Sequence, residues 1–194
     1  TKQANAVTQT LTGDESITPN KIKTYTDVRG LVCMEEILNP STNAVLYKNT
    51  YAYDLMGNLL ETKDGRAWEE DWDYTQKMEY DYAGRMLKQY DALGNFAQNT
   101  YNQLGQLVTA TDFNGASTNY TYDELGRTIQ ITTPVDDTQT GVVKQYYDKN
   151  GNLTKTAQLR GENTWSITEN TYDARNRVTA VKHADGTYTQ YAYD

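Results

Sequence analysis

The chain has 194 residues, of which 37% are hydrophobic and 23% charged, and its formal net charge at pH 7 is −8. This charge disfavours nucleic acid and anionic membrane surfaces as partners, and no apolar run reaches the roughly 18 residues that a membrane-spanning helix needs. The composition of 17 Tyr but only 2 Phe favours a single sheet over a compact two-layer core, because tyrosine packs across strands while its hydroxyl reaches water or a partner.

The first 20 residues are polar with little pattern, and we expect a lead-in that is flexible. Residues 21–44 contain what looks like a degenerate copy of a motif that recurs later, Tyr25-Thr26-Asp27-Val28-Arg29-Gly30-Leu31, with one extra residue. Cys33 is the single cysteine, which excludes an internal disulfide. We expect it to be a buried strand residue rather than a nucleophile.

Residues 45–194 carry a repeated motif, Tyr-Asp-x-x-Gly followed by Arg, Asn or Gln. Its residues are Tyr53, Asp54, Gly57; Tyr80, Asp81, Gly84; Tyr101, Asn102, Gly105; Tyr122, Asp123, Gly126; Tyr147, Asp148, Gly151; Tyr172, Asp173, Asn176; and Tyr193, Asp194. The motif tyrosines are separated by 27, 21, 21, 25, 25 and 21 residues. A fixed repeat of this length indicates an array in which each unit packs on its neighbours. Because the sequence stops within a copy, we expect an array that continues beyond residue 194 in a longer parent protein.

Additional turn signals lie between the motifs, at Asp91-x-x-Gly94, Asp112-x-x-Gly115, Asp64-Gly65 and Asp185-Gly186. From Asp81 to Asp123 the turns recur every 10 or 11 residues, a spacing typical of an antiparallel meander. We therefore predict an all-β fold of tandem antiparallel hairpins in one curved, right-twisted sheet.

The turn residues have a physical explanation. The Asp carboxylate can accept hydrogen bonds from backbone N–H groups two or more residues later, which closes a type I turn. The glycine then takes the left-handed conformation that ends a hairpin with a bulge. Asn102 keeps an acceptor in place of Asp, and Asn176 replaces glycine with the residue that best tolerates positive φ.

Alternation of polar and apolar residues marks strands at 45–53 and 68–80. Trp165 and Ile167 have the opposite parity to Tyr172, which predicts a bulge or loop before that motif.

The segment Gly115-Ala-Ser-Thr-Asn-Tyr-Thr-Tyr122-Asp123-Glu-Leu-Gly126-Arg127 resembles the consensus of the YD-repeat, or Rhs-repeat, family. That consensus continues with an aliphatic residue, a place occupied here by Leu59, Met86, Leu107, Leu153 and Val178, whereas Thr128 departs from it. The family includes bacterial Rhs and wall-associated polymorphic toxins, the C component of ABC toxin complexes, and animal teneurins.

The resemblance implies a β-strip that spirals into a hollow shell, which encloses a C-terminal effector domain in the bacterial toxins and supports adhesion in teneurins. It thereby implies a secreted or cell-surface protein whose partners are neighbouring repeats and an enclosed effector. The toxins also self-cleave at an Asp-Pro step, but the prolines at 19, 40 and 134 follow Thr18, Asn39 and Thr133. We therefore do not transfer that activity to this chain.

Four other readings compete with a structural role. The cluster Glu69, Glu70, Asp71 and Asp73 could supply paired catalytic carboxylates, but charge on the wet face of a strand explains it. Calcium could bind the turn Asp and Asn residues, but their spacing fits turn capping better. His183, the only histidine, has no marked partner for zinc or a triad.

The fourth reading is a binding face for carbohydrate or protein at Trp68, Trp72 and Tyr74, with Trp165 as a further aromatic. Cross-strand packing is the alternative explanation for these aromatic residues. We predict a non-enzymatic shell-wall segment without cofactors or metals, with an adhesion or carbohydrate-binding strip as the second hypothesis. Unprotected edge strands would also favour self-association.

Overall fold

The computed structural model describes residues 5–10, 21–65, 75–136, 139–161 and 163–194. Within these residues, sixteen strands form a sheet in which each strand pairs antiparallel with its sequence neighbours, in the order β1 to β16. The predicted all-β hairpin array is therefore confirmed. The chain divides into two compact units, residues 1–97 and 98–194.

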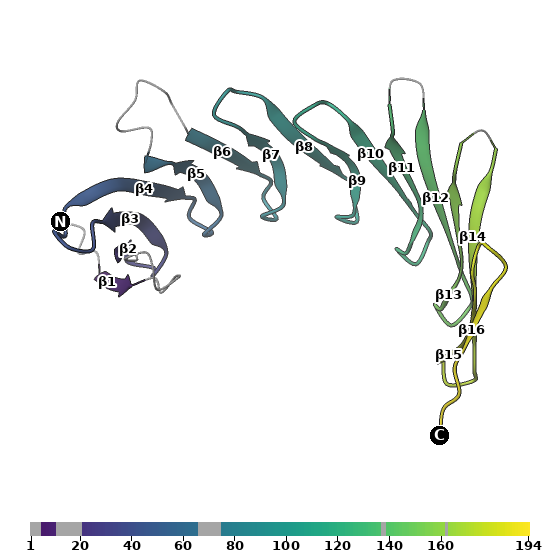
Figure 1. Cartoon of the computed structure of the whole chain (residues 1–194). Helices are drawn as coiled ribbons and strands as arrows, with labels where there is room; N and C mark the ends of the chain where they lie inside the picture. The colour runs from purple at the N-terminus through teal and green to yellow at the C-terminus, as the bar shows by residue number, and fades with distance from the viewer. Residues whose placement is uncertain (1–4, 11–20, 66–74, 137–138, 162) are drawn as a thin grey trace. The chain divides into compact units, whose positions relative to one another are not determined.

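The first unit contains seven strands and the start of the eighth. They are β1 Asn5–Thr10, β2 Lys21–Thr26, β3 Val32–Leu38, β4 Val45–Tyr53, β5 Leu59–Lys63, β6 Thr75–Tyr80, β7 Met86–Tyr90 and β8 Phe96–Tyr101. In Figure 1 the purple and blue strands β1 to β4 bend strongly around one another, so the sheet in this unit is curved.

The second unit contains the rest of the meander. Its strands are β9 Leu107–Thr111, β10 Ser117–Tyr122, β11 Thr128–Pro134, β12 Thr140–Tyr147, β13 Leu153–Leu159, β14 Trp165–Tyr172, β15 Val178–Lys182 and β16 Tyr188–Gln190. They form one twisted layer, coloured green to yellow in Figure 1.

Each motif hairpin contains a bulge at the same place. Thr121 pairs with Gln130 but Tyr122 pairs with Thr128, so Ile129 is an extra residue on β11. The corresponding extra residue lies six positions after the turn Asp or Asn in every motif hairpin: Cys33, Leu60, Leu87, Val108, Ile129, Thr154 and Thr179. The extra residue always lies on the strand that follows the turn, whereas β14 runs from Trp165 to Tyr172 without a bulge or loop. The irregularity predicted before Tyr172 is therefore wrong, because a single-layer sheet can carry apolar side chains on both of its faces.

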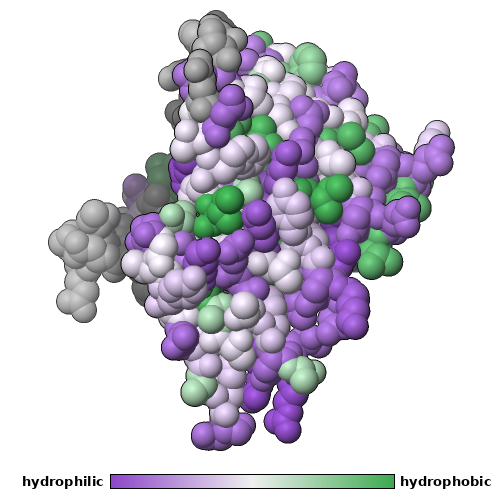
Figure 2. Space-filling view, turned by 90° about the vertical axis from the view of Figure 1, so that its right-hand side faces the viewer, coloured by the Kyte–Doolittle hydropathy of each residue, from purple (hydrophilic) through white to green (hydrophobic). Residues whose placement is uncertain are grey.

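The core is thin, as expected of a single layer. Among the described residues, the buried hydrophobic side chains are Ile37, Leu38, Met78 and Ala157, and none of the large side chains is completely buried. Figure 2 shows one face, on which the hydrophobic side chains form separate small groups among polar ones. Stability in such a sheet depends on contacts between neighbouring strands and turns rather than on a central core.

Candidate functional site

The candidate site is the repeated Tyr-Asp turn, because the motif dominates the sequence and recurs at one edge of successive hairpins. In the turn at Asp123, the carboxylate Oδ1 accepts from the backbone N–H groups of Leu125 at 3.0 Å and Arg127 at 2.9 Å. The N–H of Gly126 donates to the Asp123 carbonyl at 3.0 Å, and Gly126 has φ +82°. The Asp carboxylate and the left-handed glycine therefore close the turn together.

The residue after the glycine completes the turn through the other carboxylate oxygen. Arg127 Nε donates to Asp123 Oδ2 at 2.7 Å, and its Nη2 lies 2.6 Å from the same oxygen. Where asparagine stands in this position, its amide does the same, as Asn152 does to Asp148 at 2.9 Å. In the turn that begins at Asn102, the direction of this hydrogen bond is reversed, since the Asn102 amide donates to Gln106 Oε1 at 2.7 Å.

These hydrogen bonds stabilise the ionised form of the turn aspartates. The Arg127 side-chain hydrogen bond is the largest cause of the lowered pKa of Asp123, and the Arg85 side chain has the same effect on the pKa of Asp81. At Asp173 the largest cause of the lowered pKa is the backbone N–H of Arg177. A carboxylate held ionised by its own turn is suited to structural capping rather than to proton transfer near neutral pH.

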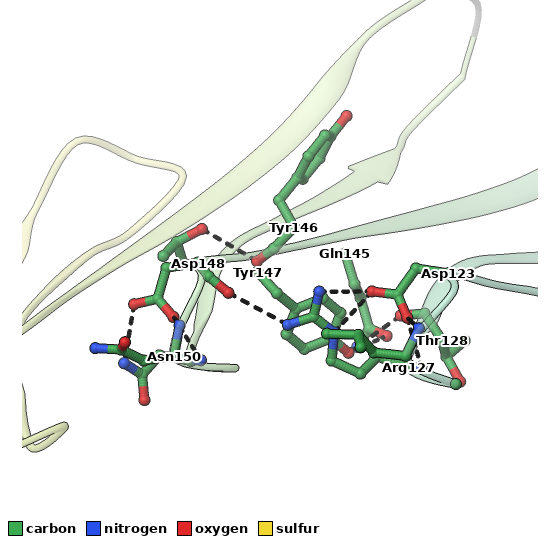
Figure 3. Close-up of polar contacts among 12 residues, drawn as sticks. Asp123, Arg127, Thr128, Gln145, Tyr146, Tyr147, Asp148 and Asn150 are labelled. Atoms are coloured by element: carbon green, nitrogen blue, oxygen red, sulfur yellow. Dashed lines mark hydrogen bonds and ion pairs between the residues drawn. The ribbon is translucent and has the colours of Figure 1, made fainter.

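The motif tyrosines connect one repeat to the preceding one. The Tyr147 hydroxyl donates to the Thr128 carbonyl at 3.1 Å, and Figure 3 shows its ring lying beside Arg127, away from the neighbouring Tyr146. The same bond joins Tyr122 to the Leu107 carbonyl at 2.7 Å, Tyr172 to Leu153 at 2.8 Å and Tyr193 to Val178 at 2.7 Å. Each acceptor residue comes directly after the last residue of its motif turn. It directly precedes the extra residue of the bulge.

A bulge interrupts the regular ladder of backbone hydrogen bonds, and a backbone carbonyl nearby needs another donor. The tyrosine hydroxyl of the next repeat supplies that donor. This explains why tyrosine, and not phenylalanine, occupies the motif at positions 122, 147, 172 and 193.

Adjacent turns also contact each other directly. Arg127 Nη1 donates to the Asp148 carbonyl at 3.2 Å (Figure 3), and the guanidinium carbon lies 4.7 Å from the centroid of the Tyr147 ring. The Arg177 guanidinium lies 4.4 Å from the Tyr193 ring centroid in the same way. One arginine therefore caps its own turn, bonds the next turn and stacks on the next tyrosine.

The degenerate copy forms the same turn by a different arrangement of residues. Asp27 Oδ1 accepts from the N–H groups of Arg29 and Leu31 at 2.8 and 3.1 Å. Leu31 stands where the regular motif has Arg or Asn, and Arg29, two positions earlier, supplies the missing side-chain bond to Asp27 at 2.9 Å. Arg29 also donates to the Asp54 carbonyl at 2.6 Å. This role of Arg29 was not predicted from the sequence. The presence of an arginine inside the turn was the feature that could have indicated it.

The other predicted turns differ in detail. Gly186 has φ +84°, but its N–H bonds the His183 carbonyl, so His183 rather than Asp185 holds the first turn position. Gly65 lacks a left-handed φ, and a Cβ there would lie 2.4 Å from the Tyr47 ring. Close packing against Tyr47, not turn geometry, explains this glycine.

Cys33 is an intermediate-burial residue of β3, less buried than expected, with its thiol 3.5 Å from the Tyr25 carbonyl. His183 is exposed and bonds Thr189 Oγ1 at 2.9 Å. Trp165 lies in β14 with Lys144 Nζ 5.2 Å from its ring centroid.

The acidic cluster Glu69, Glu70, Asp71 and Asp73 and the proposed binding face Trp68, Trp72 and Tyr74 lie outside the described residues, so both stay predictions. Within the described part of the chain, no group of three or more His, Cys, Asp or Glu residues could hold a metal ion. No helix in that part is long and apolar enough to cross a membrane.

Comparison with known proteins agrees with this geometry. The model of the teneurin YD-shell family matches residues 20–194, and the chain therefore belongs to that family. A search of curated proteins found no match.

Two solved structures share the fold. "Structure of Photorhabdus luminescens Tc holotoxin pore, Mutation TccC3-D651A" aligns with a TM-score of 0.64 and 19% identity over 90% of this chain and 10% of that chain. "Crystal Structure of TcdB2-TccC3-Cdc42" aligns with a TM-score of 0.62 and 19% identity over 84% of this chain and 9% of that chain. The present chain thus spans about a tenth of the length of these solved chains.

Proposed function

We propose that this chain is a non-enzymatic segment of the wall of a secreted or cell-surface YD-repeat shell that encloses or displays a C-terminal effector domain. The observation that carries the proposal is the repeated bond from a motif tyrosine to a carbonyl of the preceding repeat, which is formed by Tyr122, Tyr147, Tyr172 and Tyr193. The motif residues bond one another across repeats, so their chemistry is used in joining hairpins. The fold similarity to two toxin-complex chains supports the same reading.

A wall function needs stiffness, and the array has a physical source for it. The motif turns close the hairpins, and the hydroxyls of Tyr122, Tyr147, Tyr172 and Tyr193 fix four of the motif copies to the preceding repeats. In several repeats an arginine or amide adds a contact between turns, such as Gln106 Nε2 to the Gly126 carbonyl at 3.1 Å. Such nearest-neighbour contacts repeat along the array, so adding repeats extends the wall without requiring a new core.

Protease protection tests this function in the complete protein that contains the segment. A C-terminal domain enclosed by the shell should be digested far more slowly in the complete protein than when expressed alone. Replacing Tyr122, Tyr147 and Tyr172 together by Phe should increase its digestion, because the wall loses three inter-repeat bonds. Equal digestion of the enclosed and the isolated domain would refute encapsulation.

A further inference from the structure

The charged side chains of the strands lie almost entirely on one face of the sheet. Successive side chains of a strand point to opposite faces, and residues directly opposite each other in an antiparallel pair share a face. In the first unit, Lys23 pairs with Glu36, which pairs with Lys48. The register of β2 to β7 places these charged residues on that face: Lys21, Lys23, Glu36, Lys48, Glu61, Lys63, Lys77, Glu79 and Lys88. In these strands the other face carries one charge, Glu35, whose carboxylate accepts from the Tyr51 hydroxyl at 2.8 Å.

The second unit has the same sidedness. The charged residues of strands β9 to β16 are Lys144, Lys155, Glu169 and Lys182. Lys155 lies opposite both Tyr146 and Glu169, and Glu169 lies opposite Lys182. Lys144 precedes Tyr146 by two residues, so all four charges share one face. We call this side of each unit the charged face and the opposite side the uncharged face.

The charged face also carries the more exposed positions of the motif hairpins. The residue before each motif tyrosine lies on this face and is exposed in six copies, at Ala52, Glu79, Thr100, Thr121, Tyr146 and Thr171. The tyrosines that follow these residues lie on the uncharged face and are only partly exposed, and Figure 3 shows Tyr146 and Tyr147 pointing away from each other. In β6, Lys77 and Glu79 are exposed, whereas Met78 between them is only 8% exposed.

The uncharged face offers hydroxyl, amide and aliphatic groups. One row across β10 to β14 consists of Tyr120, Ile131, Val143, Gln158 and Ser166, each opposite the next. Hydroxyls and amides can bond the backbone of any polypeptide because they both donate and accept hydrogen bonds. A charge held against another chain and away from water requires a partner charge instead. The uncharged face is therefore suited to a polypeptide of any charge pattern, and the charged face is suited to water.

We infer that the uncharged face is the inner surface of the wall, where it contacts the enclosed polypeptide, and that the charged face is the outer surface. This inference rests on the proposed shell function and adds to it the orientation of the wall. A sheet with water on both sides gives no physical reason to confine the strand charges to one face. Because the inner groups are neutral, contact with the enclosed chain is insensitive to salt.

Cysteine labelling in the complete protein that contains this segment tests the orientation. Gln76 and Lys77 are adjacent in β6, both exposed, and lie on the uncharged and charged faces respectively. Thr133 and Asn119 form the equivalent exposed pair in the second unit. Each position is changed singly to Cys in a cysteine-free background that includes Cys33→Ser. The reagent is a maleimide on a polyethylene glycol chain too large to enter a closed shell.

In the isolated segment, all four cysteines should react at comparable rates, and circular dichroism should match the parent. In the complete protein, Gln76→Cys and Thr133→Cys should react at least about tenfold more slowly than in the segment, because labelling then requires local opening of the wall. Lys77→Cys and Asn119→Cys should keep their rates. Slow reaction at Lys77→Cys and Asn119→Cys, alone or together with the other two, would overturn the orientation but leave the shell intact. Unchanged rates at all four positions would show that no closed shell forms, which is the failure of the proposed function itself.

Photo-cross-linking tests the contact with the enclosed chain. A benzoylphenylalanine placed at position 76 of the complete protein should become linked to peptides of the C-terminal domain, and one placed at position 77 should not. Raising the salt concentration should leave the yield at position 76 unchanged. Links to that domain from position 77, or from neither position, would overturn the assignment of the inner face.

Discussion

At the scale of single residues, each motif side chain has one identifiable task. Aspartate accepts backbone N–H groups, glycine takes the left-handed conformation, and the following Arg or Asn holds the second carboxylate oxygen. These contacts lie within five consecutive residues, as in the turn from Asp123 to Arg127. Gly151 has φ +89°, and no atom lies within 4 Å of a Cβ placed on it. A substitution at Gly151 therefore tests the need for a left-handed backbone without creating a steric clash with neighbouring side chains.

Gly151→Val should destabilise the sheet by about 1–3 kcal/mol, because a β-branched residue is strained at positive φ. Gly151→Asn should cost less, since Asn176 occupies the equivalent place at φ +59°. Urea unfolding of the three proteins measures the difference. Equal stability of the Val and Asn variants would contradict the requirement for a left-handed residue.

Acid should weaken the turns in a defined direction. The pKa of Asp123 is lowered in the folded chain, first by the Arg127 side chain. The carboxylate therefore stabilises the fold above its unfolded pKa of about 3.9. That contribution is lost as the pH falls through the lower folded value. Asp123→Asn should reduce the decline of the urea midpoint between about pH 5 and pH 2.

Glu124→Gln is the matched control for that experiment. It removes one negative charge from the tip of the same turn but no capping hydrogen bond. If Glu124→Gln and Asp123→Asn flatten the acid dependence equally, net charge rather than the turn carboxylate controls it.

At the scale of strands and hairpins, the tyrosine bond and the bulge act together. Tyr147 donates to the Thr128 carbonyl across the pair β11–β12. Tyr146, the preceding residue of β12, is exposed, and its ring lies 5.4 Å from Lys155 Nζ. Comparing substitutions of these two tyrosines therefore separates the contribution of the hydroxyl hydrogen bond from that of an aromatic ring in a strand.

Tyr147→Phe should cost about 0.5–1.5 kcal/mol, the value of one hydrogen bond, while the ring stays beside Arg127. Tyr146→Phe should be close to neutral, because no described residue accepts a hydrogen bond from its hydroxyl. Thermal unfolding of both variants measures this difference. Two equally stable variants would show that the inter-repeat bond contributes nothing to stability.

At the scale of the molecule, damage to one repeat should remain local. Arrays held by nearest-neighbour contacts do not share a central core, and here the described core consists of a few side chains. Tyr172→Phe should therefore increase hydrogen exchange in strands β13 to β15, which surround the lost bond to Leu153, and leave β2 to β4 unchanged. A uniform loss of protection across both units would show that the array unfolds as one cooperative body.

Features that depend on residues close together in the chain could be predicted from the amino-acid sequence. The Asp-x-x-Gly turns, their left-handed glycines and the alternating strands follow from contacts within one hairpin, so spacing and residue type were enough to predict a meander. The resemblance carried by Tyr122, Asp123, Gly126 and Arg127 predicted the YD-repeat family, which the match over residues 20–194 confirmed.

Contacts between residues far apart in the chain could not be predicted from local patterns and became known only from the three-dimensional fold. The acceptor of the Tyr172 hydroxyl lies 19 residues earlier, at Leu153, and Arg29 reaches a carbonyl 25 residues later, at Asp54. The position of the bulge, six residues after each turn Asp or Asn, depends on register between two strands, which a one-residue slip would change.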